Sequence, residues 1–133
     1  MSRAVRFLGL GVLLLALAAG AYVFAARAGW LVPEEGALES RYALPASKWM
    51  DLDGQRVHYV DEGQGEAIVL VHGSFGSLRM WRDWVAALAP GHRVIRFDRP
   101  PMGLSGASPR GDYGTDREMQ IIGDLTRRLG VER

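Results

Sequence analysis

The stretch AIVLVHGSFGS, residues 67–77, is the strongest structural signal in the sequence. It opens with five consecutive apolar residues and then breaks at His72-Gly73. A continuous apolar run is typical of a strand that is buried on both faces, because helices cover both sides of a parallel sheet. Gly73 and Gly76 let the chain turn sharply and leave backbone N–H groups free to face a ligand. The stretch therefore predicts a buried strand followed by a ligand-facing loop.

Further elements alternate on the C-terminal side of this loop. A helix is predicted from five apolar residues that recur at helical spacing, Met80, Trp81, Trp84, Val85 and Leu88. Trp81 and Trp84 are expected to lie in the core or partly against a substrate cleft. Residues 93–97 form a second short strand. A last helix is predicted to begin at a capping box formed by Thr115 and Glu118 and to end at Gly130, a typical C-cap residue.

A hairpin is predicted on the N-terminal side. Asp53-Gly54 separates two strand-like segments, and this pair suits a type I′ turn, which needs positive φ at both central residues. After the turn, Val57 and Tyr59 alternate with Arg56 and His58, as in a half-buried strand with His58 facing outward. The order of hairpin, strand, helix, strand and helix predicts an α/β fold.

The first thirty residues have a different character. An uncharged stretch rich in Leu and Ala covers residues 7–26 and follows Arg3 and Arg6. Twenty helical residues span about 30 Å, the thickness of the hydrocarbon core of a bilayer, so a membrane anchor is predicted. The basic flank places the N-terminus in the cytoplasm and everything after residue 30 in the periplasm or another extracytoplasmic space. A cleaved signal peptide, cut near residues 19–21, is the alternative.

These patterns predict an anchor or signal segment over residues 1–30, a linker over 31–46 and the N-terminal portion of an α/β domain over 47–133. The composition, with 48% hydrophobic residues and a net charge of +1, excludes a disordered chain and offers no basic stripe for nucleic acid. The absence of cysteine excludes disulfides and thiolate chemistry. The acidic residues suit turns rather than a metal site, and no cofactor is expected.

Three motifs, in this order, resemble those of the α/β-hydrolase family. DGQRVHY at residues 53–59 is similar to the family's opening hairpin, and HGSFG at 72–76 resembles its His-Gly loop. FDRPPMGLS at 97–105 resembles its Asp-x-Pro-Gly-x-Gly-x-Ser loop, with Pro101 in place of the first glycine. The resemblance covers about residues 47–133 and implies the N-terminal part of an α/β-hydrolase sheet.

The resemblance implies a hydrolase with a serine nucleophile that acts on a small ester, lipid or amide substrate. In this family the backbone N–H after His-Gly, here that of Ser74, is one donor of the oxyanion hole. The surrounding binding loop consists of His72, Gly73, Phe75 and Gly76. The nucleophile, in a Gly-x-Ser-x-Gly elbow, and its acid and base come later in such chains. We therefore expect all three beyond Arg133, and the present chain to be a fragment.

Other residues of catalytic type are expected to have structural roles. His72 should hold its loop through ring hydrogen bonds, and Asp98 should organise the loop that follows its strand. Ser105 lies one residue short of an elbow pattern, with no strand running into it. His58 and His92 are expected to be solvated or packing residues. No nucleophile–base pair is thus predicted, and residues 31–133 alone should not hydrolyse a short-chain nitrophenyl ester.

Three alternative functions stay open at this point. The first is an epoxide or haloalkane hydrolase of the same fold, although we would then expect a bulky residue followed by proline after His-Gly. The second is a non-catalytic, membrane-tethered remnant. The third is a phosphate-binding loop, which the absence of a P-loop lysine and of a Gly-x-Gly-x-x-Gly pattern disfavours.

Overall fold

The computed structural model describes residues 3–31 and 36–131, which fall into two compact units, 1–38 and 39–133. The first unit contains α1 (Arg3–Arg27), and its segment Phe7–Arg27 is long and apolar enough to cross a membrane. A signal sequence near an N-terminus has the same properties. The helix is therefore compatible with both alternatives that the sequence left open.

The predicted linker is only partly described. Its residues 32–35 lie outside the described residues, as do Glu132 and Arg133 at the C-terminal end. Within the described part of the linker, a six-residue helix, α2 (Ala37–Tyr42), was not anticipated. The linker sequence showed no apolar periodicity, and so short a helix leaves little pattern to detect.

The predicted hairpin is confirmed. β1 (Lys48–Leu52) pairs with β2 (Gln55–Glu62) in antiparallel fashion, and both turn residues have positive φ, 58° at Asp53 and 78° at Gly54. A type I′ turn has this conformation because its twist matches that of the paired strands. The Asp51 carboxylate accepts the Gly54 N–H at 2.9 Å and fixes the turn.

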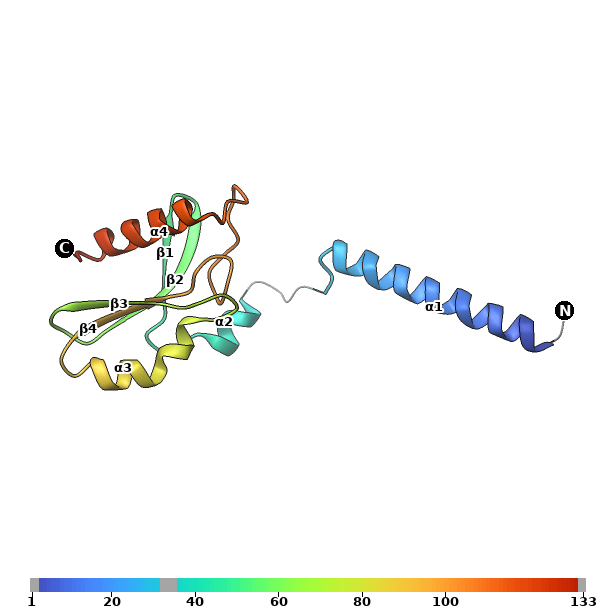
Figure 1. Cartoon of the computed structure of the whole chain (residues 1–133), viewed down its shortest axis with the longest axis horizontal. Coiled ribbons are helices and arrows are strands. Elements are labelled where there is room, and N and C mark those ends of the chain that lie inside the picture. Colours follow the sequence, from blue (N-terminus) through green and yellow to red (C-terminus); the bar gives the residue numbers. More distant parts are fainter. Residues whose placement is uncertain (1–2, 32–35, 132–133) are drawn as a thin grey trace. The chain divides into compact units, whose positions relative to one another are not determined.

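The four strands form one mixed sheet in the order β1-β2-β4-β3 (Figure 1). β4 (Arg93–Phe97) runs parallel to β3 (Ala67–Val71) and antiparallel to β2. The crossover from β3 to β4 contains η1 (Leu78–Trp81) and α3 (Arg82–Leu88). Figure 1 shows α3 and α4 (Thr115–Arg128) on opposite sides of the sheet, as the predicted α/β fold requires.

The core lies between the sheet and α4. Its buried members are Leu52, Val57, Tyr59, Phe97, Ile121 and Leu125. Ile121 and Leu125 are four residues apart and share one face of the helix. Because Val57 and Tyr59 alternate along β2, both point toward this helix.

The start of α4 differs from the prediction. Gly114 is the N-cap residue, and no side chain caps the helix, so the capping box of Thr115 and Glu118 is wrong. The Glu118 carboxylate instead forms an ion pair with Arg99, a contact that a local pattern cannot reveal. At the other end Gly130 has φ of 68° and, with Val131, donates to carbonyls of the last turn, which confirms the predicted C-cap.

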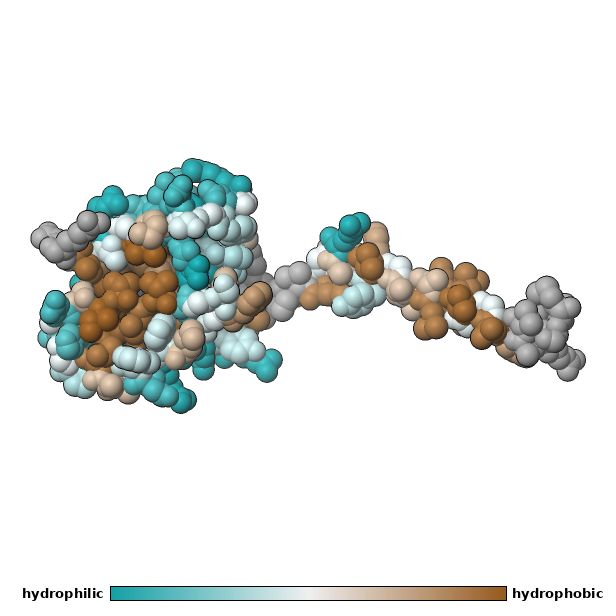
Figure 2. Space-filling view, in the orientation of Figure 1, coloured by the Kyte–Doolittle hydropathy of each residue, from teal (hydrophilic) through white to brown (hydrophobic). Residues whose placement is uncertain are grey.

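Two predictions of burial are also corrected. β3 is half-buried rather than buried, and Val71 is 37% exposed, because β3 is the edge strand of the described sheet. Figure 2 shows hydrophobic side chains on the surface where Figure 1 places β3. On η1 and α3, Met80 and Trp84 are each 59% exposed, since only Leu78 and Val85 of these helices are buried.

Candidate functional site

The loop after β3 forms a tight turn. The Gly76 N–H donates to the Gly73 carbonyl at 3.2 Å, and Phe75 has φ of 59°. Ser74 is not among the residues with positive φ, so the turn has the type II pattern, in which only the third residue is left-handed. Within residues 36–131, no acceptor is found for the Ser74 N–H. This donor, at the carboxyl end of a parallel strand, is available to a ligand.

The ring of His72 holds the loop in place through hydrogen bonds. Its buried ring donates from Nδ1 to the Gly73 carbonyl at 2.7 Å and accepts the Arg99 N–H at Nε2, at 2.9 Å. These two bonds together define the neutral ring protonated at Nδ1. The Arg99 guanidinium also donates to the His72 carbonyl at 3.0 Å. The contacts are those expected of a residue that holds its loop through ring hydrogen bonds.

Phe75 combines a left-handed backbone with a side chain that is 101% exposed. A residue with a Cβ is strained in this conformation, and no packing of the ring compensates for the strain. We expect Phe75→Gly to raise the free energy of unfolding by up to about 1 kcal/mol in urea titrations. Met119→Gly, at an exposed helical position, should lower it by about as much. Equal destabilisation by both changes would contradict the strain.

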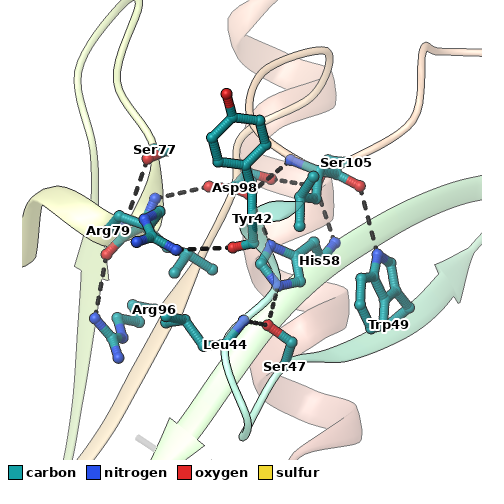
Figure 3. A network of polar contacts seen from close by, with 12 residues as sticks. Tyr42, Leu44, Ser47, Trp49, His58, Ser77, Arg79, Arg96, Asp98 and Ser105 are labelled. Carbon is teal, nitrogen blue, oxygen red and sulfur yellow. Dashed lines mark hydrogen bonds and ion pairs between the residues drawn. The ribbon is translucent and has the colours of Figure 1, made fainter. Parts of the chain in front are cut away.

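Asp98 connects three segments of the fold (Figure 3). It follows β4 directly, is 2% exposed, and its Oδ1 accepts the Leu78 N–H at 2.7 Å. Its Oδ2 accepts the Leu104 N–H at 2.8 Å and lies 2.7 Å from His58 Nδ1. Burial raises the pKa of the Asp98 carboxyl, but the hydrogen bonds from His58, Leu104 and Leu78 together bring this pKa below its usual value. The side chain is therefore a carboxylate at neutral pH.

The lowered pKa of Asp98 predicts acid sensitivity. A carboxyl with a depressed folded pKa stabilises the protein above its unfolded pKa, which is 3.8 for Asp, and loses that contribution as the pH falls through the folded value. The urea midpoint should therefore fall as the pH is lowered from about 5 to about 2. In Asp98→Asn this fall should be smaller. An equal fall in both proteins would assign the acid sensitivity to other groups.

Ser105 is part of the same network and is buried. Its Oγ donates to the Asp98 carbonyl at 2.6 Å and accepts the His58 N–H at 2.9 Å. The hydroxyl is thus engaged with backbone groups on both sides and contacts no side-chain base. This arrangement agrees with the structural role expected for Ser105.

The outward position predicted for His58 is wrong, and of the two roles expected for it, solvated or packing, the structure shows packing. The ring is 1% exposed and lies between Asp98 and Ser47, with Nε2 2.7 Å from Ser47 Oγ. Trp49 covers the ring at a centroid distance of 4.9 Å. β2 lies inside the sheet, and the loop containing Asp98 and Ser105 covers its second face, so the inward–outward alternation fails here. The contact between His58 and Ser47 was not revealed by the sequence.

The comparisons with known proteins agree with this fold. Residues 66–133 match the family model described as the alpha/beta hydrolase fold. Over 87 residues the chain is 36% identical to haloalkane dehalogenase 2 of Mycobacterium tuberculosis, covering 65% of this chain and 30% of that protein. The chain thus spans about 30% of the length of the curated relatives it matches first.

Solved structures also resemble this chain. An epoxide hydrolase from Acinetobacter nosocomialis has a TM-score of 0.59 at 29% identity, covering 65% of this chain and 28% of that one. A bromoperoxidase from Bacillus anthracis has a TM-score of 0.58 at 31% identity, covering 63% of this chain and 31% of that one. Each similarity thus covers roughly two thirds of this chain and less than a third of the other enzyme.

Proposed function

The chain belongs to the alpha/beta hydrolase family, and on this basis we propose that residues 47–133 are the N-terminal portion of a serine-nucleophile hydrolase domain. Its substrate is a small ester, lipid or amide. The nucleophile, acid and base belong to a continuation beyond Arg133. In support, the chain spans about 30% of its curated relatives, and no Gly-x-Ser-x-Gly occurs in residues 1–133.

The Ser74 turn is the observation that carries this proposal. Acyl transfer places negative charge on the carbonyl oxygen of the substrate, and preorganised N–H donors stabilise that charge. The Ser74 N–H is one such donor, because the type II turn leaves it without an internal acceptor. His72 and Arg99 hold the turn in place, so that little reorganisation is needed during the reaction.

A second candidate function is supported by the relatives. The chain is 36% identical to a haloalkane dehalogenase and 29% identical to an epoxide hydrolase over the matched regions. Against this candidate, Ser74 and Phe75 follow His-Gly where we expected a bulky residue and then proline. We therefore favour a serine-nucleophile hydrolase over a haloalkane or epoxide hydrolase.

A substrate panel tests the two candidates. The complete gene product that contains residues 1–133 is purified and assayed with nitrophenyl butyrate, styrene oxide and 1-bromobutane. The proposal expects ester turnover without release of bromide or opening of the epoxide. Turnover of only the halide or the epoxide would replace it with the second candidate. Inactivity on all three would favour a non-catalytic tethered protein.

We also propose that α1 anchors the protein, with its N-terminus in the cytoplasm and residues after 30 outside it. A helix of this length and hydropathy suits a bilayer, and Arg3 and Arg6 precede it. A phosphatase reporter that is active only outside the cytoplasm, fused after residue 46, should be active and remain in the membrane after carbonate washing. Release of the active reporter would indicate a cleaved signal peptide, and an inactive reporter would contradict the orientation.

A further inference from the structure

Ser47, His58 and Asp98 form a hydrogen-bonded series outside the His72–Ser77 loop (Figure 3). Ser47 Oγ lies 2.7 Å from His58 Nε2, and His58 Nδ1 lies 2.7 Å from Asp98 Oδ2. The three residues come from separate parts of the chain: the segment before β1, the middle of β2 and the end of β4. Both distances fall within the range that links a serine nucleophile, its base and its acid.

The hydrogen bonds also place the protons. Asp98 is a buried carboxylate that accepts backbone N–H groups of Leu78 and Leu104, so its remaining partner, His58 Nδ1, is the donor. Nε2 lies 2.7 Å from Ser47 Oγ, and in the tautomer that carries a proton on Nδ1 alone it accepts the Ser47 hydroxyl. Trp49 packs over the ring and keeps its orientation. The arrangement is that of a general base held ready to take a proton from a serine.

Ser47 is less buried than Ser105. It is half-buried, and its Oγ also accepts the Leu44 N–H at 2.8 Å. Leu44 lines a cavity of about 180 Å³ together with Arg79, Arg82 and Arg96. The guanidinium groups of these arginines have partners of their own: Arg96 pairs with Glu62, Arg82 pairs with Asp83, and Arg79 donates to the Tyr42 carbonyl. Leu44, whose N–H contacts Ser47 Oγ, thus lines this cavity, whereas Ser47 is not among the lining residues.

We propose that Ser47 is a nucleophile that acylating and phosphonylating compounds modify, with His58 as its general base and Asp98 as a positioning residue. With a fluorophosphonate, the Oγ–P bond forms and the P–F bond breaks. The Oγ proton passes to His58 Nε2, and fluoride leaves. The product is one covalent adduct per chain. This site needs no residue beyond Arg133, so the test of this proposal is independent of the test of the function proposed above.

The test uses the 133-residue chain in detergent micelles with a fluorophosphonate probe, followed by intact mass measurement and peptide mapping. We expect one adduct, located at Ser47, on the folded protein and none after unfolding in urea. Ser47→Ala should reduce labelling at least tenfold. Ser108→Ala, which removes an equally half-buried serine outside the network, should label like the parent.

The role of the base is tested separately. His58→Gln should slow adduct formation about 100-fold, the usual contribution of a general base. Circular dichroism identifies variants that do not fold, and the comparison of folded with urea-unfolded parent chain remains decisive if His58→Gln is one of them. Absence of an adduct on the folded chain, equal labelling of Ser47→Ala, or equal labelling of unfolded protein would overturn the proposal and leave the network a purely structural one.

Discussion

Asp98→Ala is expected to lower the free energy of unfolding of the 39–133 unit by about 3–5 kcal/mol. The substitution leaves the N–H groups of Leu78 and Leu104 and the ring of His58 buried without their common acceptor. Small domains are stable by only about 5–15 kcal/mol, so the substitution should remove a large fraction of the total stability. Urea titration at pH 7, followed by tryptophan fluorescence, measures the loss.

Asp61→Ala is the matched control for this change. The Asp61 carboxylate also accepts hydrogen bonds from a cationic side chain, that of Arg93, but this ion pair is partly exposed. Losing the pair should lower the free energy of unfolding by about 1 kcal/mol or less. A cost for Asp98→Ala no larger than that for Asp61→Ala would contradict the view that Asp98 organises the loops of the site.

Ser74→Pro should lower kcat of the complete enzyme about 10²- to 10³-fold, the usual effect of losing one oxyanion donor. Proline removes the backbone N–H, yet it is common at the second position of a type II turn, so the turn itself should survive. Ester turnover by the purified enzyme, with circular dichroism as a check on folding, measures the effect. KM should change much less than kcat, because the donor acts mainly in the transition state.

Ser74→Ala is the comparison that separates backbone from side chain. It removes the hydroxyl and keeps the N–H, so its kcat should exceed that of Ser74→Pro at least tenfold. If both variants lose activity equally, the hydroxyl rather than the amide is the important group, and the role assigned to the Ser74 backbone is wrong.

The elements that could be predicted from the sequence depend on local chemistry. Asp53-Gly54 predicts its hairpin because few other pairs accept two positive φ values in succession. Gly130 predicts a helix end for the same reason. The apolar run at 67–71 predicts a strand, although its edge position in the described sheet depends on how many strands lie beyond it.

The network around Asp98 could not be predicted, because it depends on distant contacts. Ser47 and His58 are 11 residues apart in sequence, and His58 and Asp98 are 40 apart. The alternation of side chains along the strand predicts an outward position for His58. The residue is buried only because a loop folds over β2. The sequence likewise predicts that Glu118 forms a capping box with Thr115, yet in the structure Glu118 forms an ion pair with Arg99 from another segment.

The coding sequence that follows codon 133 tests the central claim most directly. If residues 47–133 begin a serine-nucleophile hydrolase domain, a strand and a Gly-x-Ser-x-Gly elbow should follow within about twenty codons. The serine at its centre would be the nucleophile that works with the Ser74 N–H. Aspartate at that central position would contradict the serine mechanism and favour epoxide or haloalkane hydrolysis, and a stop codon would contradict the existence of a catalytic domain.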